Sequence, residues 1–271
     1  ILECSIQLFI IFFGGVMHFD LTDNKLPLLT TKKLAYKTCL KELLWFISGN
    51  TSNKVLNNQN VHIWDGNSSR QYLDSVGLTE REEGDLGPIY GFQWRHFNAS
   101  YYSCNNDYTN QGIDQLSSII EELKNPVTRN SRRLILTAWN PCQIKEMALP
   151  PCHILCQFNV TNNTKLSCSL YQRSGDLGLG VPFNIASYSF LTHLIAKICN
   201  LEACEFIYNL GNIHIYDDHI NNLRTQLTKI PYTFPSININ NDSSNIDEYK
   251  FEDFIIKNYN SHESIKLLMR E

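Results

Sequence analysis

The chain has 271 residues, 43% of them hydrophobic and 11% aromatic, so it can bury a large core as one large domain or two small ones. Its formal net charge is −4, from 23 Lys and Arg against 27 Asp and Glu, which excludes the strongly basic balance of a DNA-binding or membrane-surface protein. Nine cysteines without CxxC pairs favour free thiols in a reducing, cytoplasmic compartment over a disulfide or zinc framework.

The first predicted element is the apolar stretch from Leu8 to Phe13. It is far shorter than the roughly 20 residues that a membrane-spanning helix needs. It also lacks the basic start and the small-residue cleavage site of a signal peptide. We therefore expect a buried strand here. The chain opens with Ile1 rather than Met, which is compatible with a truncated N-terminus.

Three helices are predicted from hydrophobic periodicity. Residues 32–48 carry leucine and isoleucine at spacings of three and four, which places them on one face of a helix. Residues 113–126 repeat that spacing, and Pro126 marks the end. Residues 183–200 are apolar almost all round, which is typical of a central buried helix.

Four further apolar runs predict strands: Leu134 to Trp139, Ile154 to Val160, Leu166 to Gln172 and Phe206 to Leu210. The Asn-, Asp- and Ser-rich residues 238–245 indicate a surface loop rather than a linker. Helices and strands mix irregularly and no repeat is visible. The predicted class is therefore α/β (α+β), as a single domain built on a mostly central sheet.

The stretch "ALPPCHILCQF", residues 148–158, places Cys152 and His153 side by side after two prolines. Pro150 and Pro151 fix the backbone that leads into the predicted strand. Cys152 therefore stands at the start of a rigid element, where its side chain can be aimed. A buried cysteine that only fills the core is the structural alternative.

The segment "YQRSGDLGLGVPFN", residues 171–184, combines three glycines with Arg173, Ser174 and Asp176. Glycines let a backbone approach a ligand, and Arg and Ser suit a phosphate, while Asn184 can pair with an amide edge. Taken alone, the pattern also fits ordinary turn chemistry.

The adjacent pair Arg132 and Arg133 precedes a predicted strand. Neighbours in a strand point to opposite faces, so both can serve one site only across a bend or an interface. On the residues alone, a solvated pair is favoured.

The order and spacing of several motifs resemble the thymidylate synthase family. They are "PLLTTKK", "ELLWFISGNT", "IWD", "DLGPIYGFQWRHF", "LPPCH" and "YQRSGDLGLGVPFNIASY". The resemblance runs from about Gly14 to about Met269. It is closest to the synthase half of fused dihydrofolate reductase–thymidylate synthases, as in "LPPCHILCQF", "GNIHIYDDHI" and "IPYTFP".

The resemblance implies the fold of that family, a large mixed sheet packed against its dimer mate and covered by helices. It implies the conversion of dUMP to dTMP with 5,10-methylenetetrahydrofolate, which becomes dihydrofolate, and no metal. It also implies an obligate homodimer and a dihydrofolate reductase that is fused or associated.

Seven residues take catalytic roles by this resemblance: Cys152, Glu42, Tyr90, Asn67, His153, Arg173 and Asp176. Cys152 is implied to be the nucleophile that adds to C6 of the uracil, beside Arg173. Glu42 and Asn67 are implied to organise water and proton transfer, and Tyr90 to assist proton removal at C5. His153 is expected behind the nucleophile, with a purely structural histidine as the alternative.

The resemblance also implies two binding sets. Residues for dUMP are Arg132, Arg133, Arg173, Ser174, Gln172, Asn184, His214 and Tyr216, with Arg132 and Arg133 reaching the partner's phosphate across the interface. Residues for the folate are Trp64, Asp176, Leu179, Gly180, Phe183 and Met269.

Two departures from the family pattern stand at the termini. Cys4 occupies the position of an arginine that closes over the dUMP phosphate, in an atypical N-terminal loop at 1–13, and the chain ends in Arg270 and Glu271. These leave a weakly active nucleotide- or partner-binding relative as the alternative to an active synthase. A pyrimidine hydroxymethylase is opposed by Asn184, where relatives that act on dCMP carry Asp.

Overall fold

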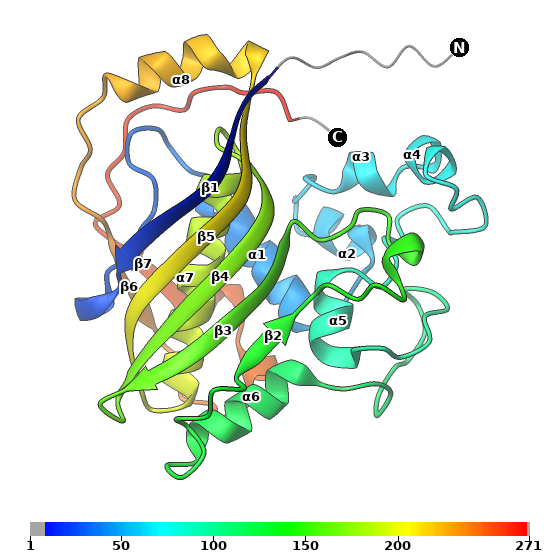
Figure 1. The fold of residues 1–271 in the computed structure, drawn as a ribbon, viewed down its shortest axis with the longest axis horizontal. Coiled ribbons are helices and arrows are strands. Elements are labelled where there is room, and N and C mark those ends of the chain that lie inside the picture. The colour runs from blue at the N-terminus through cyan, green and yellow to red at the C-terminus, as the bar shows by residue number, and fades with distance from the viewer. Residues whose placement is uncertain (1–8, 270–271) are drawn as a thin grey trace.

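The computed structural model describes residues 9–269, and Figure 1 shows their arrangement. The strands are β1 (Phe9–Asp20), β2 (Ile135–Thr137), β3 (His153–Thr161), β4 (Lys165–Asp176), β5 (Glu202–Tyr216), β6 (Ser236–Ile239) and β7 (Phe254–Lys257). The α-helices are α1 (Tyr36–Ile47), α2 (Asn53–Asn57), α3 (Asp65–Ser68), α4 (Arg70–Ser75), α5 (Tyr90–His96), α6 (Gln115–Lys124), α7 (Gly180–Ile198) and α8 (Ile220–Leu227).

The main sheet has five strands in the order β1-β5-β4-β3-β2, and β6 pairs with β7 in a separate two-stranded sheet. All neighbours in the main sheet are antiparallel except β4 and β5, which are parallel. Parallel neighbours need a crossover, and α7 supplies it between them. The mixed α/β class predicted from the sequence is confirmed.

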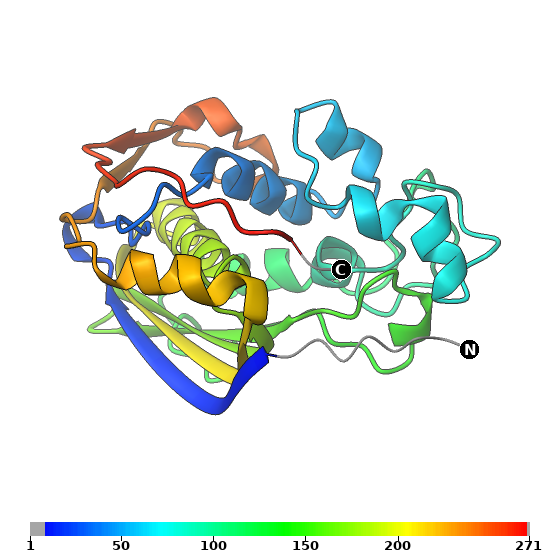
Figure 2. The ribbon, with the colours of Figure 1, turned by 90° about the horizontal axis from the view of Figure 1, so that it is seen from above.

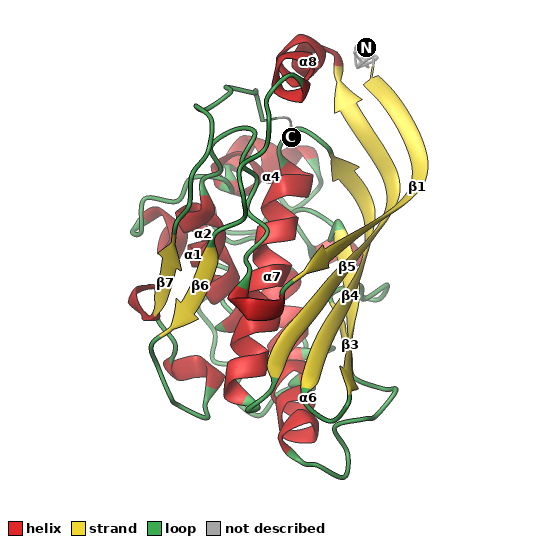
Figure 3. Ribbon diagram, turned by 90° about the vertical axis from the view of Figure 1, so that its left-hand side faces the viewer, coloured by secondary structure: helices red, strands yellow, loops and turns green. Residues whose placement is uncertain are grey.

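The helices cover one face of the main sheet. Helix α7 packs on β4 and β5, and α1 packs on the outer side of α7, as Figures 2 and 3 show. Helix α7 is therefore enclosed by sheet and helix, which explains why its sequence is apolar almost all round. The second face of the sheet carries no helix within residues 9–269 (Figure 3).

The predicted helices and strands are present, with shifted ends. The helix predicted at 32–48 begins only at Tyr36, and the one predicted at 183–200 already begins at Gly180. The loop predicted at 238–245 begins inside β6, because Asn238 and Ile239 pair with β7. No helix within residues 9–269 has the length and apolar character to cross a bilayer.

Leu8 lies outside the described residues, and for Ile10 to Phe13 the predicted strand is present but the predicted burial is wrong. Residues 9–13 belong to β1, so they are also not part of a loop at 1–13. Ile10 is 54% exposed and Phe13 is 78% exposed. The physical reason is position: β1 lies at the edge of the sheet, so its side chains have neighbours on one side only.

Candidate active site

Cys152 stands in the bend immediately before β3 and is fixed through its backbone. Its N–H donates to the hydroxyl oxygen of Tyr90 at 2.7 Å, and its carbonyl accepts from the N–H of Arg173 at 2.8 Å. The pairing of β3 with β4 shifts register just after it, between His153 and Leu155. The thiol is thereby aimed from a point that α5 and β4 hold together.

The two prolines hold the arginine that accompanies this thiol. Arg173 donates from Nε to the Pro151 carbonyl at 2.8 Å and from Nη2 to the Pro150 carbonyl at 3.0 Å. Its Nη2 then lies 3.9 Å from Cys152 Sγ. The diproline therefore supplies two acceptors that fix a guanidinium beside the sulfur, in addition to stiffening the chain.

The protonation of Cys152 reflects opposing influences. Burial raises the pKa of the thiol above its ordinary value, while the charge of Arg173 and a hydrogen bond from Tyr90 lower the pKa. The desolvation of the buried thiolate outweighs the effect of the one nearby guanidinium.

Tyr90 and His153 stack behind the cysteine, with ring centroids 4.1 Å apart. Burial holds the pKa of Tyr90 well above its usual range, so its phenol keeps a proton that it can donate. Burial also lowers the pKa of His153 to about 3, and its Nδ1 lies 2.8 Å from the Tyr188 hydroxyl. The imidazole is therefore neutral at neutral pH and packs against Tyr90.

Glu42 is a buried carboxyl on α1. Its Oε1 accepts a hydrogen bond of 2.7 Å from Trp64 Nε1. Burial raises the pKa of Glu42 to about 7, although the bond from Trp64 lowers it. Asn67, on α3, has a buried Nδ2 with no hydrogen-bond partner among residues 9–269. A carboxyl group with a pKa near 7 and an amide group with an unpaired donor can each form hydrogen bonds with the polar edge of a ligand.

The raised pKa of Glu42 predicts a pH-dependent stability difference. The folded chain keeps this proton up to about pH 7, whereas the reference value for glutamate is 4.5. The contribution is therefore complete below pH 4.5 and is lost as pH rises through 7. Relative to the parent, Glu42→Gln should gain up to about 3 kcal/mol in the free energy of unfolding across this window.

Urea unfolding at several pH values measures this gain. Glu121→Gln, which changes an exposed glutamate on α6, is the matched control. If the Glu42→Gln and parent curves stay parallel between acid and neutral pH, the buried carboxyl does not titrate as inferred.

The turn after β4 brings Asp176 to the start of α7. Asp176 Oδ1 accepts from the N–H of Gly178 at 2.8 Å, and Lys32 Nζ donates to the Gly178 carbonyl at 2.5 Å. Leu179 and Gly180 follow at the first turn of α7. The predicted folate-side residues at this turn therefore lie together, with Asp176 held by its own turn.

Four further predicted residues lie close to this turn in the chain: Gln172, Ser174, Phe183 and Asn184. Asn184 is buried in the second turn of α7, and Phe183 packs against the main hydrophobic core. Gln172 is 2% exposed, and both ends of its amide are already bonded, to the Tyr208 hydroxyl at 2.5 Å and the Ser174 carbonyl at 2.7 Å. Gln172 thus stabilises the strand end itself.

His214 and Tyr216 end β5 beside the same turn. His214 is the register partner of Asp176 across the parallel strands, and the rings of His214 and Tyr216 meet edge-on with centroids 5.3 Å apart. Burial lowers the pKa of His214, which favours its neutral form. The parallel pairing of β4 with β5 therefore brings Asp176 together with His214 and Tyr216, which come from a distant segment of the chain.

Arg132 and Arg133 do not join this group within one chain. Both are exposed, just before β2. The N–H of Phe158 donates to the carbonyl of Leu134, so the pair lies alongside the far half of β3. Six residues of strand separate Phe158 from Cys152, which is about 20 Å.

The remaining predictions concern the ends of the chain. Met269 is exposed, 54% of its surface being accessible, and lies at the end of the C-terminal segment. Cys4, Arg270 and Glu271 lie outside the described residues.

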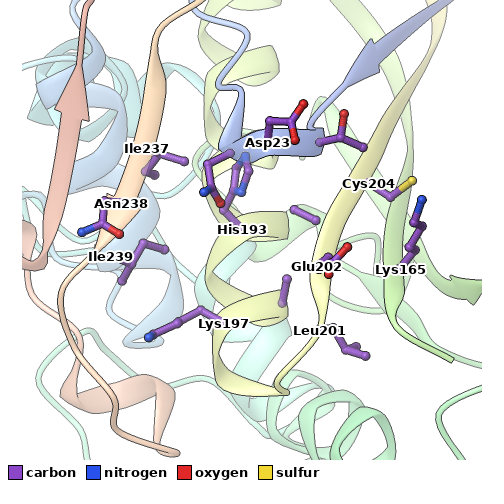
Figure 4. A pocket seen from close by; sticks show the side chains of 14 residues that line it. Asp23, Lys165, His193, Lys197, Leu201, Glu202, Cys204, Ile237, Asn238 and Ile239 are labelled. Carbon is purple, nitrogen blue, oxygen red and sulfur yellow. The ribbon is translucent and has the colours of Figure 1, made fainter.

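A cavity of about 500 Å³ lies elsewhere, between the start of β5, the end of α7 and β6. Asp23, His193, Lys197 and Cys204 are among its lining residues (Figure 4). None of the predicted site residues lines it, so it is separate from the candidate active site. Residues 9–269 contain no cluster of three or more His, Cys, Asp or Glu side chains that could hold a metal ion.

Sequence reasoning missed several residues of the site. Lys32, Tyr188 and His219 each contact a predicted residue or its turn, from positions far away in the chain. All three stand inside quoted motifs, Lys32 in "PLLTTKK", Tyr188 in "YQRSGDLGLGVPFNIASY" and His219 in "GNIHIYDDHI", which is the only sequence signal for them.

Comparisons with known proteins identify the family to which the chain is similar. A family model described as thymidylate synthase matches residues 7–270. The chain is 52% identical over 257 residues to a bifunctional dihydrofolate reductase-thymidylate synthase of Paramecium tetraurelia, covering 95% of this chain and 54% of that protein. It is 53% identical over 263 residues to a probable thymidylate synthase of Schizosaccharomyces pombe, covering 93% and 42%. A thymidylate synthase of Saccharomyces cerevisiae is 52% identical over 262 residues, covering 93% and 85%. The chain thus spans about half the length of the first two relatives.

Proposed function

Because the chain belongs to the thymidylate synthase family, we propose that it is a methyltransferase that converts dUMP to dTMP. The one-carbon and hydride donor is 5,10-methylenetetrahydrofolate, which leaves as dihydrofolate. The observation that carries this proposal is the geometry at Cys152, whose sulfur lies 3.9 Å from a guanidinium that two proline carbonyls hold in place. That arrangement suits a nucleophile beside an anionic substrate.

The first step is addition of the Cys152 sulfur to C6 of the uracil. The new S–C6 bond moves the electrons of the C5–C6 double bond toward C5 and O4. Arg173 favours the attacking thiolate, and on the dUMP side it is also placed to contact the phosphate. Burial opposes thiolate formation. We therefore expect dUMP to bind first, with its phosphate in contact with Arg173, and the sulfur to react afterwards.

Glu42, Asn67 and Tyr90 then manage protons around the ring. Charge develops at O4, and a carboxyl with a pKa near 7 can return a proton there, directly or through water. The unpaired Nδ2 of Asn67 is available to hold such a water. C5 forms its bond to the methylene carbon and loses its own proton, and Tyr90 keeps a hydroxyl proton beside Cys152 to relay that transfer. Attack by C5 breaks the bond of the methylene carbon to N10 of the folate, and loss of the C5 proton expels N5 and leaves an exocyclic methylene on the ring. Hydride transfer from the released tetrahydrofolate to that methylene gives the methyl group and dihydrofolate, and the ring electrons re-form the C5–C6 double bond and expel the Cys152 sulfur as a thiolate.

In this proposal, specificity for the substrates comes from Asn184 and from the side chains at the ends of β4 and β5. The amide of Asn184 can both donate to O4 and accept from N3–H of uracil, whereas an Asp would suit a cytosine. His214 and Tyr216 hold the 3′-hydroxyl of the ribose. Asp176 receives the pterin, with Trp64, Leu179, Gly180, Phe183 and Met269 along the folate. These assignments follow the family resemblance and the shared location of the residues.

The active unit in this proposal is a symmetric homodimer. The pair Arg132 and Arg133 lies about 20 Å from Cys152 of its own chain, so its contact with phosphate must be made in the partner's site. The sheet face without helices offers the packing surface (Figure 3). The printed name of the Paramecium tetraurelia protein pairs a synthase with a dihydrofolate reductase. This supports a reductase that is fused to or associated with this chain and recycles its product.

A reducing, cytoplasmic location accords with the cysteines. All eight described cysteines, from Cys39 to Cys204, are free thiols. A nucleophilic cysteine needs its thiol reduced to act.

The proposed activity predicts coupled formation of two products. Purified protein with dUMP and 5,10-methylenetetrahydrofolate should form dihydrofolate, which a spectrophotometric assay records. It should release tritium from dUMP labelled at C5 at the same rate. Omission of the folate, deoxyuridine without phosphate, and dCMP are the controls. No dihydrofolate from dUMP, or equal rates with dCMP, would contradict the proposal.

A further inference from the structure

His219 connects two parts of the molecule that are remote in sequence. It ends the short helix η3 (Asp217–His219), is 1% exposed, and lies between the C-terminal segment and the turn after β4. Its Nε2 lies 2.8 Å from the carbonyl oxygen of Leu268. Its Nδ1 lies 3.7 Å from Oδ1 of Asp176. The imidazole therefore faces a main-chain acceptor on one side and a carboxylate on the other.

The contact with Asp176 is incomplete. A carbonyl oxygen only accepts, so Nε2 of His219 must carry a proton. Nδ1 is buried and has no hydrogen-bond partner among residues 9–269. The separation of 3.7 Å from Asp176 exceeds hydrogen-bond distance. A shift of about 0.7 Å would bring Nδ1 and the carboxylate oxygen within hydrogen-bond distance.

The surroundings leave little freedom for either partner. A methyl group on Gly178 would lie 2.9 Å from His219 Nδ1 and 3.0 Å from Leu267 Cδ1. The same turn is held from its other side by Lys32, which donates to the Gly178 carbonyl. Asp176, His219 and the C-terminal segment are thus packed so closely that a change at one must be felt by the others.

We propose that His219 is a positioning residue that couples Asp176 to the seating of the C-terminal segment, residues 264–269. Through Nε2 it fixes the Leu268 carbonyl, and through Nδ1 it responds to the Asp176 carboxylate. The proposal rests on the proposed function only in that Asp176 receives the folate. By reciprocity, whatever engages Asp176 then alters how firmly the segment is seated.

Tryptic cleavage after Lys266 tests the link without any ligand. Lys266 is exposed, but cleavage requires the segment to leave its place. Asp176→Asn should raise the cleavage rate by about fivefold or more. Cleavage after Lys257, which is held in β7, is the internal control and should not change. An unchanged rate at Lys266 in Asp176→Asn would overturn the proposal and leave His219 as a simple anchor.

A double-mutant cycle separates coupling from anchoring. His219→Gln keeps a donor near Nε2 and loses the nitrogen that faces Asp176. If His219 transmits the effect, Asp176→Asn adds nothing in the His219→Gln background. The matched control is Asn222→Ala, which removes another anchor of the segment, the 3.0 Å bond from Asn222 Nδ2 to the Lys266 carbonyl. In the Asn222→Ala background, Asp176→Asn should still raise the rate of cleavage after Lys266 by the full factor. Independent effects of Asp176→Asn and His219→Gln would refute the coupling.

The kinetic consequence is a split between the two substrates. His219→Gln should raise the KM for 5,10-methylenetetrahydrofolate by about fivefold or more and leave the Kd for dUMP within about twofold. Asn222→Ala should leave both within about twofold. An equal loss for both substrates in His219→Gln would indicate a general structural role. The proteolysis result stands even if the protein makes no dTMP, so a failure of the proposed function can be told apart from a failure of this link.

Discussion

Cys152→Ser should lower turnover by about 10⁴-fold or more and leave binding of dUMP within about threefold of the parent. A serine hydroxyl is a far weaker nucleophile than a thiolate, and Arg173 cannot ionise it. The backbone bonds of residue 152 to Tyr90 and Arg173 use main-chain atoms, so they survive the substitution. The proposed phosphate, ribose and uracil contacts also lie on other residues.

Tritium release from dUMP labelled at C5 measures the chemistry, and equilibrium dialysis measures binding of dUMP. Cys142→Ser is the matched control, because Cys142 is an exposed thiol ten residues away. It should retain the activity of the parent. Turnover of Cys152→Ser close to that of the parent would end the assignment of the nucleophile. Loss of dUMP binding would show that the substitution disturbs more than the reacting atom.

The second large effect is complementation between two inactive dimers. Removing Arg132 and Arg133 together should weaken the enzyme strongly, since each arginine contact with phosphate contributes roughly 1.5–3 kcal/mol. If the pair serves the partner's site, a hybrid of the Arg132→Ala/Arg133→Ala chain with a Cys152→Ser chain contains one intact site. Random exchange at equal amounts should then restore about a quarter of the parent activity.

Subunit exchange must be demonstrated separately, for example with chains of distinguishable mass. A mixture of Cys152→Ser with Cys152→Ala is the control, because neither chain can supply a thiol. If the subunits exchange and activity does not recover, Arg132 and Arg133 act in the active site of their own chain or in no active site.

Local sequence signals predicted the helices well because the causes are local. Apolar residues at spacings of three and four identify α1 and α6, and the continuous apolar run identifies the enclosed helix α7. The same run-based reasoning failed for Ile10 to Phe13. Whether an apolar strand is buried depends on its place in the sheet, and an edge position cannot be read from the strand itself.

Residues of the candidate site were named from the sequence where one short motif contains them, and they were missed where distant segments meet. Cys152 and Arg173 were named from their own motifs. The balance of the thiol's pKa could not be predicted, because it depends on burial by the assembled fold. Lys32 and His219 contact the Asp176 turn from positions far away in the chain, so only the fold shows that they belong beside it.

Strand β4 carries both Arg173, beside the thiol, and Asp176, at the proposed folate end. Only two residues separate them, and side chains on a strand alternate in direction. At a spacing of three positions the two side chains lie on opposite faces of the strand, and one amino acid inserted or deleted between them would move one of them to the other face. In evolutionary terms, this strand should reject insertions and deletions at positions 173–176 while accepting many substitutions elsewhere along it. The number of residues between Arg173 and Asp176 should therefore stay constant among related sequences. The residue types around these two positions should vary before that number does.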